Sequence, residues 1–423
     1  MQIRVWDNNL KVRLAGEALY NMLFWMYFPF ITVYFAVAVG SHIAGIMMAA
    51  LPLFSMVGNL LGGALADRYG RRPVMLLGTM LQALLFAIFA VSSSHILDYF
   101  AYVGVGFGGA MYRPASSAMV ADLVPVEHRR QVFATYMTAN NIGAVLGPAL
   151  GAVFFFQYKQ ELLWTCALVM LLYFIAIVVM VHETLPYSTR SKGPSTTVRR
   201  VFKEQWTGYG VILRDKVFLV YIFAGIFAMV PIMQLDLYLP VYVTQYVPAQ
   251  SIWTWNGEPF NLTSTEIFGA LLGFNGFLFV VFILPVTKWF DRWKERNVFI
   301  LSSLLSGFGT FALSFSTNIW FLFMMTIFFT FGEMVRTPVT QSFISRYAPE
   351  HARGQYMGAD NLQYTIGKMV APVTVFLSGW LAPMGIFSIV LVFAMISTVL
   401  YIWLFHIYAE PERAEVPGRS SIQ

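Results

Sequence analysis

The stretch GGALADRYGRRP (residues 62–73) places one acid and three arginines between two strongly apolar segments. Gly62, Gly63 and Gly70 allow the helices before and after the turn to approach closely and the chain to bend sharply, because glycine has no side chain in the way. Asp67 lies four residues before Arg71, a spacing at which opposite charges on a helix pair. A charged turn between two long apolar runs is typical of membrane helices that end at the bilayer surface.

The composition of the whole chain indicates the same class. The 423 residues are 58% hydrophobic and 11% charged, whereas soluble domains are roughly 25% charged, and the mean hydropathy is +0.65. Apolar runs long enough to cross a hydrocarbon core of about 30 Å recur along the chain. Such runs must be helices, because lipid offers no hydrogen-bond partner to an unpaired backbone group. We predict an all-α integral membrane protein with twelve transmembrane helices at about 14–38, 43–65, 73–93, 97–122, 131–156, 161–181, 217–246, 266–287, 298–316, 319–344, 356–381 and 384–408.

Lysine and arginine are distributed unequally between the two sides of these helices. If the N-terminus is inside, the tails and loops on that side hold 23 of the 27 lysines and arginines, and the opposite loops hold only Lys159. The positive-inside rule then predicts cytoplasmic N- and C-termini for a multi-pass protein of the cell inner (cytoplasmic) membrane. This topology explains the net charge of +6, so no nucleic-acid partner is needed to account for it.

The chain divides into two similar halves. We predict an N-terminal six-helix bundle over 1–183, a cytoplasmic linker over 184–215, a C-terminal six-helix bundle over 216–409 and a cytoplasmic tail over 410–423, because the linker is the longest polar stretch. A loop is predicted at 247–265. A shift of 224 residues aligns, without a gap, Asp67 with Asp291, Arg72 with Arg296, Pro114 with Pro338, Pro125 with Pro349, Arg129 with Arg353 and Pro148 with Pro372. Two pseudo-symmetric bundles around a cavity at mid-membrane form a transporter architecture.

These motifs resemble those of the major facilitator superfamily. Gly63-x-x-x-Asp67-Arg68-x-Gly70-Arg71-Arg72 matches the signature of its loop 2–3, and Asp291 and Arg292 form a degraded copy in loop 8–9. Gly143, Gly147, Pro148 and Gly151 in the fifth helix resemble the Gly-Pro signature of the drug:proton antiporter branch, with Ala152 in place of its usual last glycine. The resemblance implies the major facilitator fold and an antiporter of the multidrug efflux type. The arginine that this branch often places in the outer part of helix four is missing here.

The charged turns are predicted to form a cytoplasmic gate. A charge network there can clamp the two halves in one state and part in the other, which gives the two packings that alternating access requires. Alternatively, the arginines only set the topology. The predicted gate residues are Gly63, Asp67, Arg68, Gly70, Arg71, Arg72, Asp122, Asp291 and Arg292.

The fifth helix carries a stripe of glycines. Gly143, Gly147 and Gly151 repeat every four residues and share one face, and Pro148 interrupts the hydrogen-bond ladder. We expect this face to pack backbone-close against another helix. A further role, sealing the cavity against proton leak, stays open.

Ionisable residues at membrane depth are the candidates for proton coupling, because each costs about 2.5 to 3.5 kcal/mol to insert. Glu333 is the first candidate. It lies near mid-depth in FFTFGEMVRTP (328–338), where a carboxyl that loses hydration can hold or release a proton. Alternatively, Arg336 neutralises Glu333 from three residues along the helix.

Two more acids are predicted to take part in proton coupling. Asp236 titrates alone or pairs with Lys368, and Glu17 binds a proton or forms an interfacial pair with Arg13. The roles of Lys368 and Asp360 stay open.

The predicted substrate cavity is rich in aromatic residues and methionine. Such side chains adapt to many ligand shapes, and aromatic rings attract cations, so we expect lipophilic, often cationic substrates. Arg113 would be the partner of an anion or the counter-charge of an acid. The alternative is that these apolar stripes face lipid or other helices. The predicted cavity residues are Arg113, Tyr112, Tyr136, Asn140, Trp25, Phe28, Met233, Tyr238 and Arg336.

Taken together, the sequence predicts a proton-coupled secondary antiporter that exports lipophilic, drug-like compounds by alternating access. The alternatives are a proton-linked lipid or glycolipid flippase and a small-solute transporter on the same fold. We expect no enzyme activity, no cofactor and no metal, because the six histidines lie near helix ends without ligand spacing. The expected partners are membrane lipids, lipophilic small molecules and protons, and the expected state is a monomer. The substrate list, proton stoichiometry and resting conformation are not determined by the sequence.

Overall fold

The computed structural model describes residues 6–185, 215–255, 258–290, 292–348 and 353–414. It is almost entirely helical, and its twelve membrane-length helical segments agree with the predicted fold class. Within the described residues, nine helical segments are long and apolar enough, by length and composition, to cross a membrane. The first six helices, here called the first bundle, are α1 (Asn8–Val39), α2 (Ser41–Tyr69), α3 (Arg71–Val91), α4 (His95–Leu123), α5 (Val126–Gln157) and α6 (Lys159–Met180).

The remaining elements form the second bundle. They are α9 (Lys216–Met233), α10 (Tyr238–Tyr246), β1 (Gln250–Trp255), β2 (Glu258–Leu262), α11 (Ser264–Phe290), α12 (Glu295–Ala312), η2 (Leu313–Phe315), α13 (Ile319–Tyr347), α14 (Arg353–Val370), α15 (Val373–Leu377) and α16 (Pro383–Ala414). The prediction of a loop over 247–265 is wrong for its central part, because β1 and β2 pair there as an antiparallel hairpin.

The predicted seventh helix is not continuous. The last turn of α9 contains Pro231, and residues 234–237 form a turn before α10 begins. Proline has no N–H and disturbs the ladder around it, and the N–H of Gln234 bonds back to the Pro231 carbonyl at 3.1 Å in place of a normal helical bond. The predicted eleventh helix is broken in the same way, since α14 ends at Val370 and Pro372 precedes α15.

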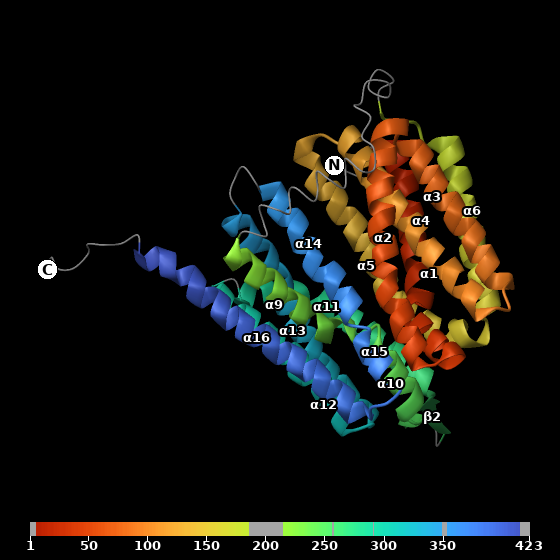
Figure 1. Ribbon diagram of the computed structural model, residues 1–423. Coiled ribbons are helices and arrows are strands. Elements are labelled where there is room, and N and C mark those ends of the chain that lie inside the picture. Colours follow the sequence, from red (N-terminus) through yellow and green to blue (C-terminus); the bar gives the residue numbers. More distant parts are fainter. Residues whose placement is uncertain (1–5, 186–214, 256–257, 291, 349–352, 415–423) are drawn as a thin grey trace.

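The two bundles meet at one end of the molecule and diverge at the other (Figure 1). We call the end with the start of α1 and the α2–α3 turn the basic end, and the end with α10, α15 and the hairpin the opposite end. Between the bundles, α5 packs on α11, α2 on α14 and α15, and α1 on α10. Near the opposite end, Nδ1 of His42 lies 2.7 Å from the Phe376 carbonyl oxygen, and a Cβ at Gly45 would come within 2.5 Å of the Phe376 backbone nitrogen.

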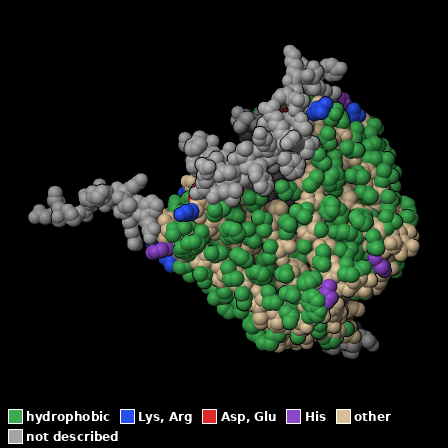
Figure 2. All heavy atoms as spheres, viewed as in Figure 1, with side chains coloured by type: hydrophobic (Ala, Val, Ile, Leu, Met, Phe, Trp, Pro, Cys, Tyr) green, Lys and Arg blue, Asp and Glu red, His purple; other side chains and the backbone are tan. Residues whose placement is uncertain are grey.

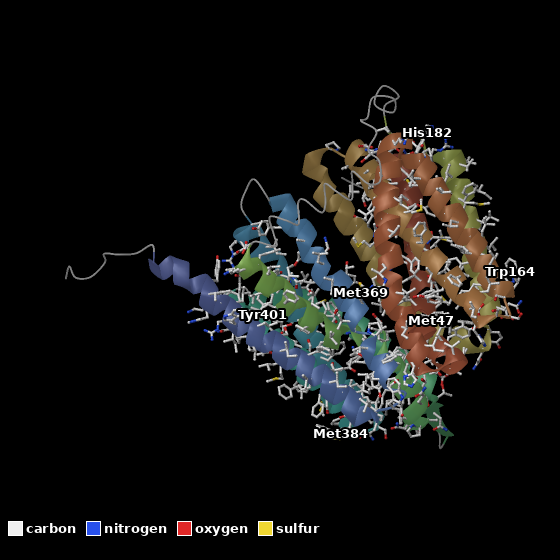
Figure 3. All side chains as sticks on the ribbon, in the orientation of Figure 1. Met47, Trp164, His182, Met369, Met384 and Tyr401 are labelled. Atoms are coloured by element: carbon white, nitrogen blue, oxygen red, sulfur yellow. The ribbon has the colours of Figure 1, made fainter. Side chains whose placement is uncertain are left out.

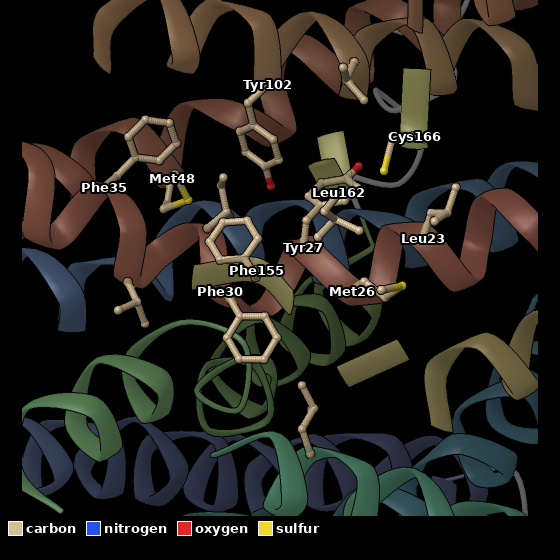
Figure 4. Packing of buried hydrophobic residues seen from close by; sticks show 14 of the residues in the cluster. Leu23, Met26, Tyr27, Phe30, Phe35, Met48, Tyr102, Phe155, Leu162 and Cys166 are labelled. Atoms are coloured by element: carbon tan, nitrogen blue, oxygen red, sulfur yellow. The ribbon is translucent and has the colours of Figure 1, made fainter. Parts of the chain in front are cut away.

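The outer surface and the interior follow the expectations for a membrane protein. Hydrophobic side chains cover most of the face shown in Figure 2, and Lys and Arg gather near its edges. Inside, the ring of Phe30 on α1 stacks on Phe155 of α5 (Figure 4). The same ring meets Phe268 of α11 edge-on. Apolar contacts from α1 therefore connect both bundles.

At the basic end, α1 and α6 are joined by a reciprocal pair of hydrogen bonds. The Asn9 side chain donates to the His182 carbonyl at 3.0 Å, and the His182 N–H donates to the Asn9 side-chain oxygen at 2.9 Å. Figure 3 shows His182 at this end and Trp164 toward the far end of α6. These bonds fix the start of α1 to the chain just after α6.

Candidate functional site

Asp236 lies in the break between α9 and α10. Its Oδ1 atom is buried, and no described residue donates a hydrogen bond to it. Its backbone carbonyl accepts a hydrogen bond from Thr32 Oγ1 of α1 at 3.3 Å, which ties the break to the first bundle. The ammonium group of Lys368 acts electrostatically on this carboxylate. A buried carboxylate with an open oxygen has unused capacity to bind a proton or a cation.

Glu333 lies on α13 within the same electrostatic environment. The charge of Asp236 acts on the Glu333 carboxyl, and Asn275 on α11 is its hydrogen-bonding neighbour. The Asn275 amide also donates to Thr330 Oγ1 at 2.9 Å. Asp236 and Asn275, from two other elements, therefore both act on the Glu333 carboxyl.

Arg336 does not serve as the counter-charge of Glu333. Its Nη2 donates instead to Gln363 Oε1 at 2.9 Å, and Gln363 donates to Asp360 at 2.7 Å. Tyr221 of α9 donates to the same Asp360 oxygen at 3.0 Å. Arg336 and Asp360 therefore belong to a separate polar network that joins α9, α13 and α14.

Lys368 lies between the two bundles. Its Nζ is 4.5 Å from the centroid of the Tyr364 ring and 5.9 Å from that of Phe28 on α1, distances at which a ring attracts a cation. Lys368 is therefore a cation that is held by aromatic rings and acts on Asp236 through its charge. The sequence left its role open, because Phe28 and Asp236 come from other elements of the fold.

Glu17 is the centre of a polar cluster in the first bundle. Arg13 Nε donates to Glu17 Oε1 at 2.6 Å, and the same oxygen accepts from Ser116 at 2.7 Å and from Tyr112 at 3.2 Å. The Tyr112 and Tyr173 hydroxyls are 2.5 Å apart. Unlike Asp236, Glu17 is paired with an arginine and fully engaged, which is the Arg13 pairing that the sequence held as an alternative.

Arg13 is itself held by several groups. Nη1 donates to the Ser116 carbonyl at 2.8 Å, and the guanidinium lies over the Tyr136 ring at 4.3 Å. The Tyr136 hydroxyl donates to the Leu10 carbonyl at 2.8 Å. Tyr136, a predicted cavity residue, therefore supports Arg13.

A cavity of about 370 Å³ lies beside this cluster, among α1, α3, α4 and α6. Tyr112 and Arg113 are the two predicted cavity residues that line it. The remaining predicted cavity residues lie elsewhere. Trp25 packs against Gly147 and Phe28, Met233 and Tyr238 are buried in apolar clusters, Arg336 lies in the network with Gln363, and the side chain of Asn140 is outside the described residues. None of these described residues lines this cavity, so their place in a substrate cavity stays a prediction.

Arg71 organises the α2–α3 turn. It donates to Asp67 at 3.1 Å and to Asp122 of α4 at 3.2 Å. Gly70 adopts φ 111°, a conformation that favours glycine. The carboxylate of Glu183 accepts from the backbone N–H groups of Arg71 and Arg72 at 2.9 and 3.1 Å, which caps the start of α3.

All of these gate contacts lie within the first bundle. Arg68 lies over the ring of neighbouring Tyr69, Arg292 is exposed, and Asp291 is outside the described residues. In the described part of the chain no ion pair joins this turn to the second bundle, and the bundles diverge at this end (Figure 1). The described residues therefore show no clamp between the halves in this conformer, and the clamp stays a prediction.

The glycines of the turn act on a different helix from the one expected. A Cβ at Gly62 would come within 2.2 Å of the Met111 backbone on α4, whereas a Cβ at Gly63 would meet only Pro114, at 3.9 Å. The close approach is therefore between α2 and α4. The expected close approach of α2 to α3 through Gly62 and Gly63 is wrong.

The glycine stripe of α5 faces α1. Cβ atoms at Gly143, Gly147 and Gly151 would come within 2.7, 2.5 and 2.2 Å of the Met22, Trp25 and Met26 positions. Such distances require glycine, so the two backbones are in direct contact. Pro148 lies inside the unbroken α5.

Several residues of these clusters had no sequence signal that singled them out. Ser116, Tyr173 and Glu183 join them through long-range contacts. Asn275, a lone amide in the apolar stretch LLGFNGFLF (271–279), could have been noticed as a buried polar group. Within the described chain, no group of three or more His, Cys, Asp or Glu residues could hold a metal ion.

Two six-segment bundles with ionisable side chains in their interiors are an architecture typical of membrane transporters. The family model of the Major Facilitator Superfamily matches residues 14–251 and 247–422. The chain therefore belongs to the Major Facilitator Superfamily, whose members are transporters and not enzymes.

Two relatives and one solved structure illustrate this membership. The chain is 38% identical over 416 residues to a Na(+), Li(+), K(+)/H(+) antiporter of Planococcus maritimus, covering 96% of this chain and 98% of the relative. It is 26% identical over 378 residues to the multidrug resistance protein MdtH of Escherichia coli (strain SE11), covering 86% and 85%. A crystal structure of peptide transporter POT in complex with sulfate has a TM-score of 0.73 at 16% identity, covering 97% of this chain and 96% of that chain, which shows the fold alone.

Proposed function

We propose that this protein is a proton-coupled antiporter that exports a monovalent cation from the cytoplasm in exchange for a proton. The observation that carries the proposal is the pair Asp236 and Glu333, two acids in one interior environment, one of them with a buried oxygen free of described donors. The proposal places the protein in the inner membrane with both termini in the cytoplasm, working as a monomer without a cofactor.

The chemistry follows from the exclusion of water. A carboxylate in a low-dielectric site needs a partner, and a proton and a cation are alternative partners for the same charge. If each binds as the other leaves, the site couples the two fluxes. Lys368, tethered near Asp236, provides a charge that neutralises the carboxylate between these steps.

Na⁺, Li⁺ and K⁺ are the first candidates for the exported cation. Carboxylate and amide oxygens, which Asp236, Glu333 and Asn275 supply, are hard ligands that suit hard cations. The 38% identical relative is named as an antiporter of these three ions. Its similarity over nearly the whole of both chains supports the assignment.

Lipophilic organic cations are the second candidate. Phe28 lies beside Lys368 near the acids, and aromatic rings attract organic cations. The 26% identical relative is named a multidrug resistance protein. The Gly-Pro stripe on α5, which resembles that of drug:proton antiporters, agrees with export.

The two candidates are separated by a flux experiment on the full-length protein. Proteoliposomes with an acidic lumen and a trapped pH-sensitive dye receive external NaCl, LiCl, KCl, ethidium or choline chloride. Antiport predicts lumenal alkalinisation with at least one of the alkali salts and none with choline. A response to ethidium alone would instead favour the drug assignment, and no response to any cation would contradict the proposal.

A matched variant controls for the removal of a carboxyl group. Glu161 at the start of α6 is exposed, so Glu161→Gln removes an acid away from the interior site. This variant is expected to respond as the wild type does. Asp236→Asn is expected to reduce the cation-dependent rate at least tenfold, and an unchanged rate would remove Asp236 from the site.

A further inference from the structure

The cavity in the first bundle contains a positive charge without an acidic partner. Arg113 lines this cavity and is exposed, although its neighbours Tyr112 and Ala115 on α4 are buried. No described residue forms an ion pair with Arg113; the nearby group on which its charge acts is the hydroxyl of Tyr20. An arginine side chain has five N–H donors and is always charged.

The other charges of the cavity cancel. Arg13 and Glu17 also line it, but they bind each other at 2.6 Å, and both are further held by Ser116. One positive charge therefore remains, on Arg113. The cavity is thus suited to an anion and unsuited to a metal cation.

The internal repeat shows that two equivalent positions carry different charges in the two bundles. The shift of 224 residues places Gly109 at the position of Glu333 and Arg113 at that of Thr337. The first bundle thus lacks the acid and has a cation, while the second has the acid and a neutral threonine. At Gly109 the absent side chain leaves room for Gln82, whose Nε2 lies 2.9 Å from where a Cβ would stand.

The walls of the cavity also contain groups for the remainder of a ligand. Tyr20, Tyr173 and Met170 offer ring and thioether surface, and Gln82 offers an amide. A cavity of about 370 Å³ is near the lower end of the range for small-molecule sites. Arginine binds a planar carboxylate through two parallel hydrogen bonds.

We propose that this cavity is a binding site for a compact organic carboxylate, with Arg113 as the residue that binds the carboxylate group. The site is separate from the acids of the second bundle and does not rest on the cation exchange proposed above. An aromatic monocarboxylate fits the combination of one positive charge and tyrosine and methionine walls.

Binding of benzoate tests the proposal. The purified full-length protein is titrated with sodium benzoate and its thermal unfolding midpoint is measured, with NaCl added to hold the total sodium concentration constant. Benzamide, which has the same ring without the charge, serves as the matched ligand. Benzoate is expected to raise the midpoint in a saturable manner, and benzamide and chloride are not.

Variants assign the effect to one side chain. Arg113→Gln is expected to weaken the apparent benzoate affinity at least tenfold, and Arg113→Lys less, because lysine keeps the charge without the paired hydrogen bonds. Arg296→Gln removes an exposed arginine at the start of α12 and is expected to bind as the wild type does.

Three results would overturn the proposal. They are the absence of any benzoate effect on the wild type, an equal effect of benzoate on Arg113→Gln, and equal stabilisation by chloride, which would indicate a site for inorganic anions. The measurement needs no proton gradient, so its failure leaves the cation exchange proposal standing, and failure of the flux experiment leaves this one standing.

Discussion

At the scale of single residues, the same chemical group has different roles in the two bundles. Glu17 accepts hydrogen bonds from Arg13, Tyr112 and Ser116, so its charge is compensated on every side. Asp236 keeps a buried oxygen without a described donor. Two acids of predicted membrane helices therefore differ in their partners. These partners decide whether a carboxyl group has a structural role or is free to exchange a proton for a cation.

Glu17→Gln is expected to lower the stability of the protein more than it changes ion coupling. Breaking a buried ion pair costs about 3 to 5 kcal/mol, because Arg13 keeps an uncompensated charge. The unfolding midpoint should fall clearly, while cation-dependent proton flux per folded molecule stays within about twofold. A lost flux with an unchanged midpoint would return Glu17 to the coupling residues.

Lys368→Met is expected to alter the ion-exchange site without removing its acids. Without the tethered ammonium, the Asp236 carboxylate loses its counter-charge, so it binds the proton more readily and releases it less readily. The optimum of cation-driven flux should therefore move to higher pH. An optimum that does not move would show that Lys368 is not coupled to Asp236.

At the scale of elements, long apolar runs and internal repetition determined most of what the sequence could predict. The helices were predictable because lipid imposes one solution on such runs. The break at 234–237 and the hairpin after α10 were not, because a proline in an apolar run is compatible with both a kinked and a broken helix. Whether Arg13, Glu17 and Ser116 come together depends on how each helix is rotated about its axis. The sequence does not predict this rotation when a helix is apolar on every face.

The contact between α1 and α5 gives a prediction of stability. Gly147→Val is expected to destabilise the protein by about 1 to 3 kcal/mol, because the new side chain overlaps Trp25 and the Met22 carbonyl. Gly106→Val is the control, since a Cβ at Gly106 meets nothing within 4 Å. Equal unfolding midpoints for the two variants would contradict the close packing of α1 on α5.

At the scale of the whole molecule, the bundles are joined at the opposite end and separate at the basic end (Figure 1). We call the contact between the bundles at the opposite end the seam; it includes His42 and Gly45 of α2, which pack against Phe376 of α15. Alternating access requires a second packing in which this seam opens and the basic end closes. The Asp67–Arg71–Asp122 network would then meet the second bundle.

A bulky residue in the seam is expected to favour that second packing. Gly45→Phe removes the space that the Phe376 backbone occupies, so the distance between spin labels at Arg68→Cys and Arg292→Cys should shorten. Both label positions are exposed, and the native Cys166 is buried. The same labels with Gly106→Phe provide the control, and an unchanged distance in Gly45→Phe would contradict the assignment of the seam as the opposite gate.

The most direct test of the coupling claim is tracer sodium transport by Glu333→Gln in proteoliposomes. The glutamine amide cannot bind and release the proton, but it keeps a carbonyl oxygen that can contact the cation. We therefore predict that sodium exchange at equal pH persists. Sodium accumulation driven by a proton gradient should fall at least tenfold. Full proton-driven accumulation by Glu333→Gln would contradict the account.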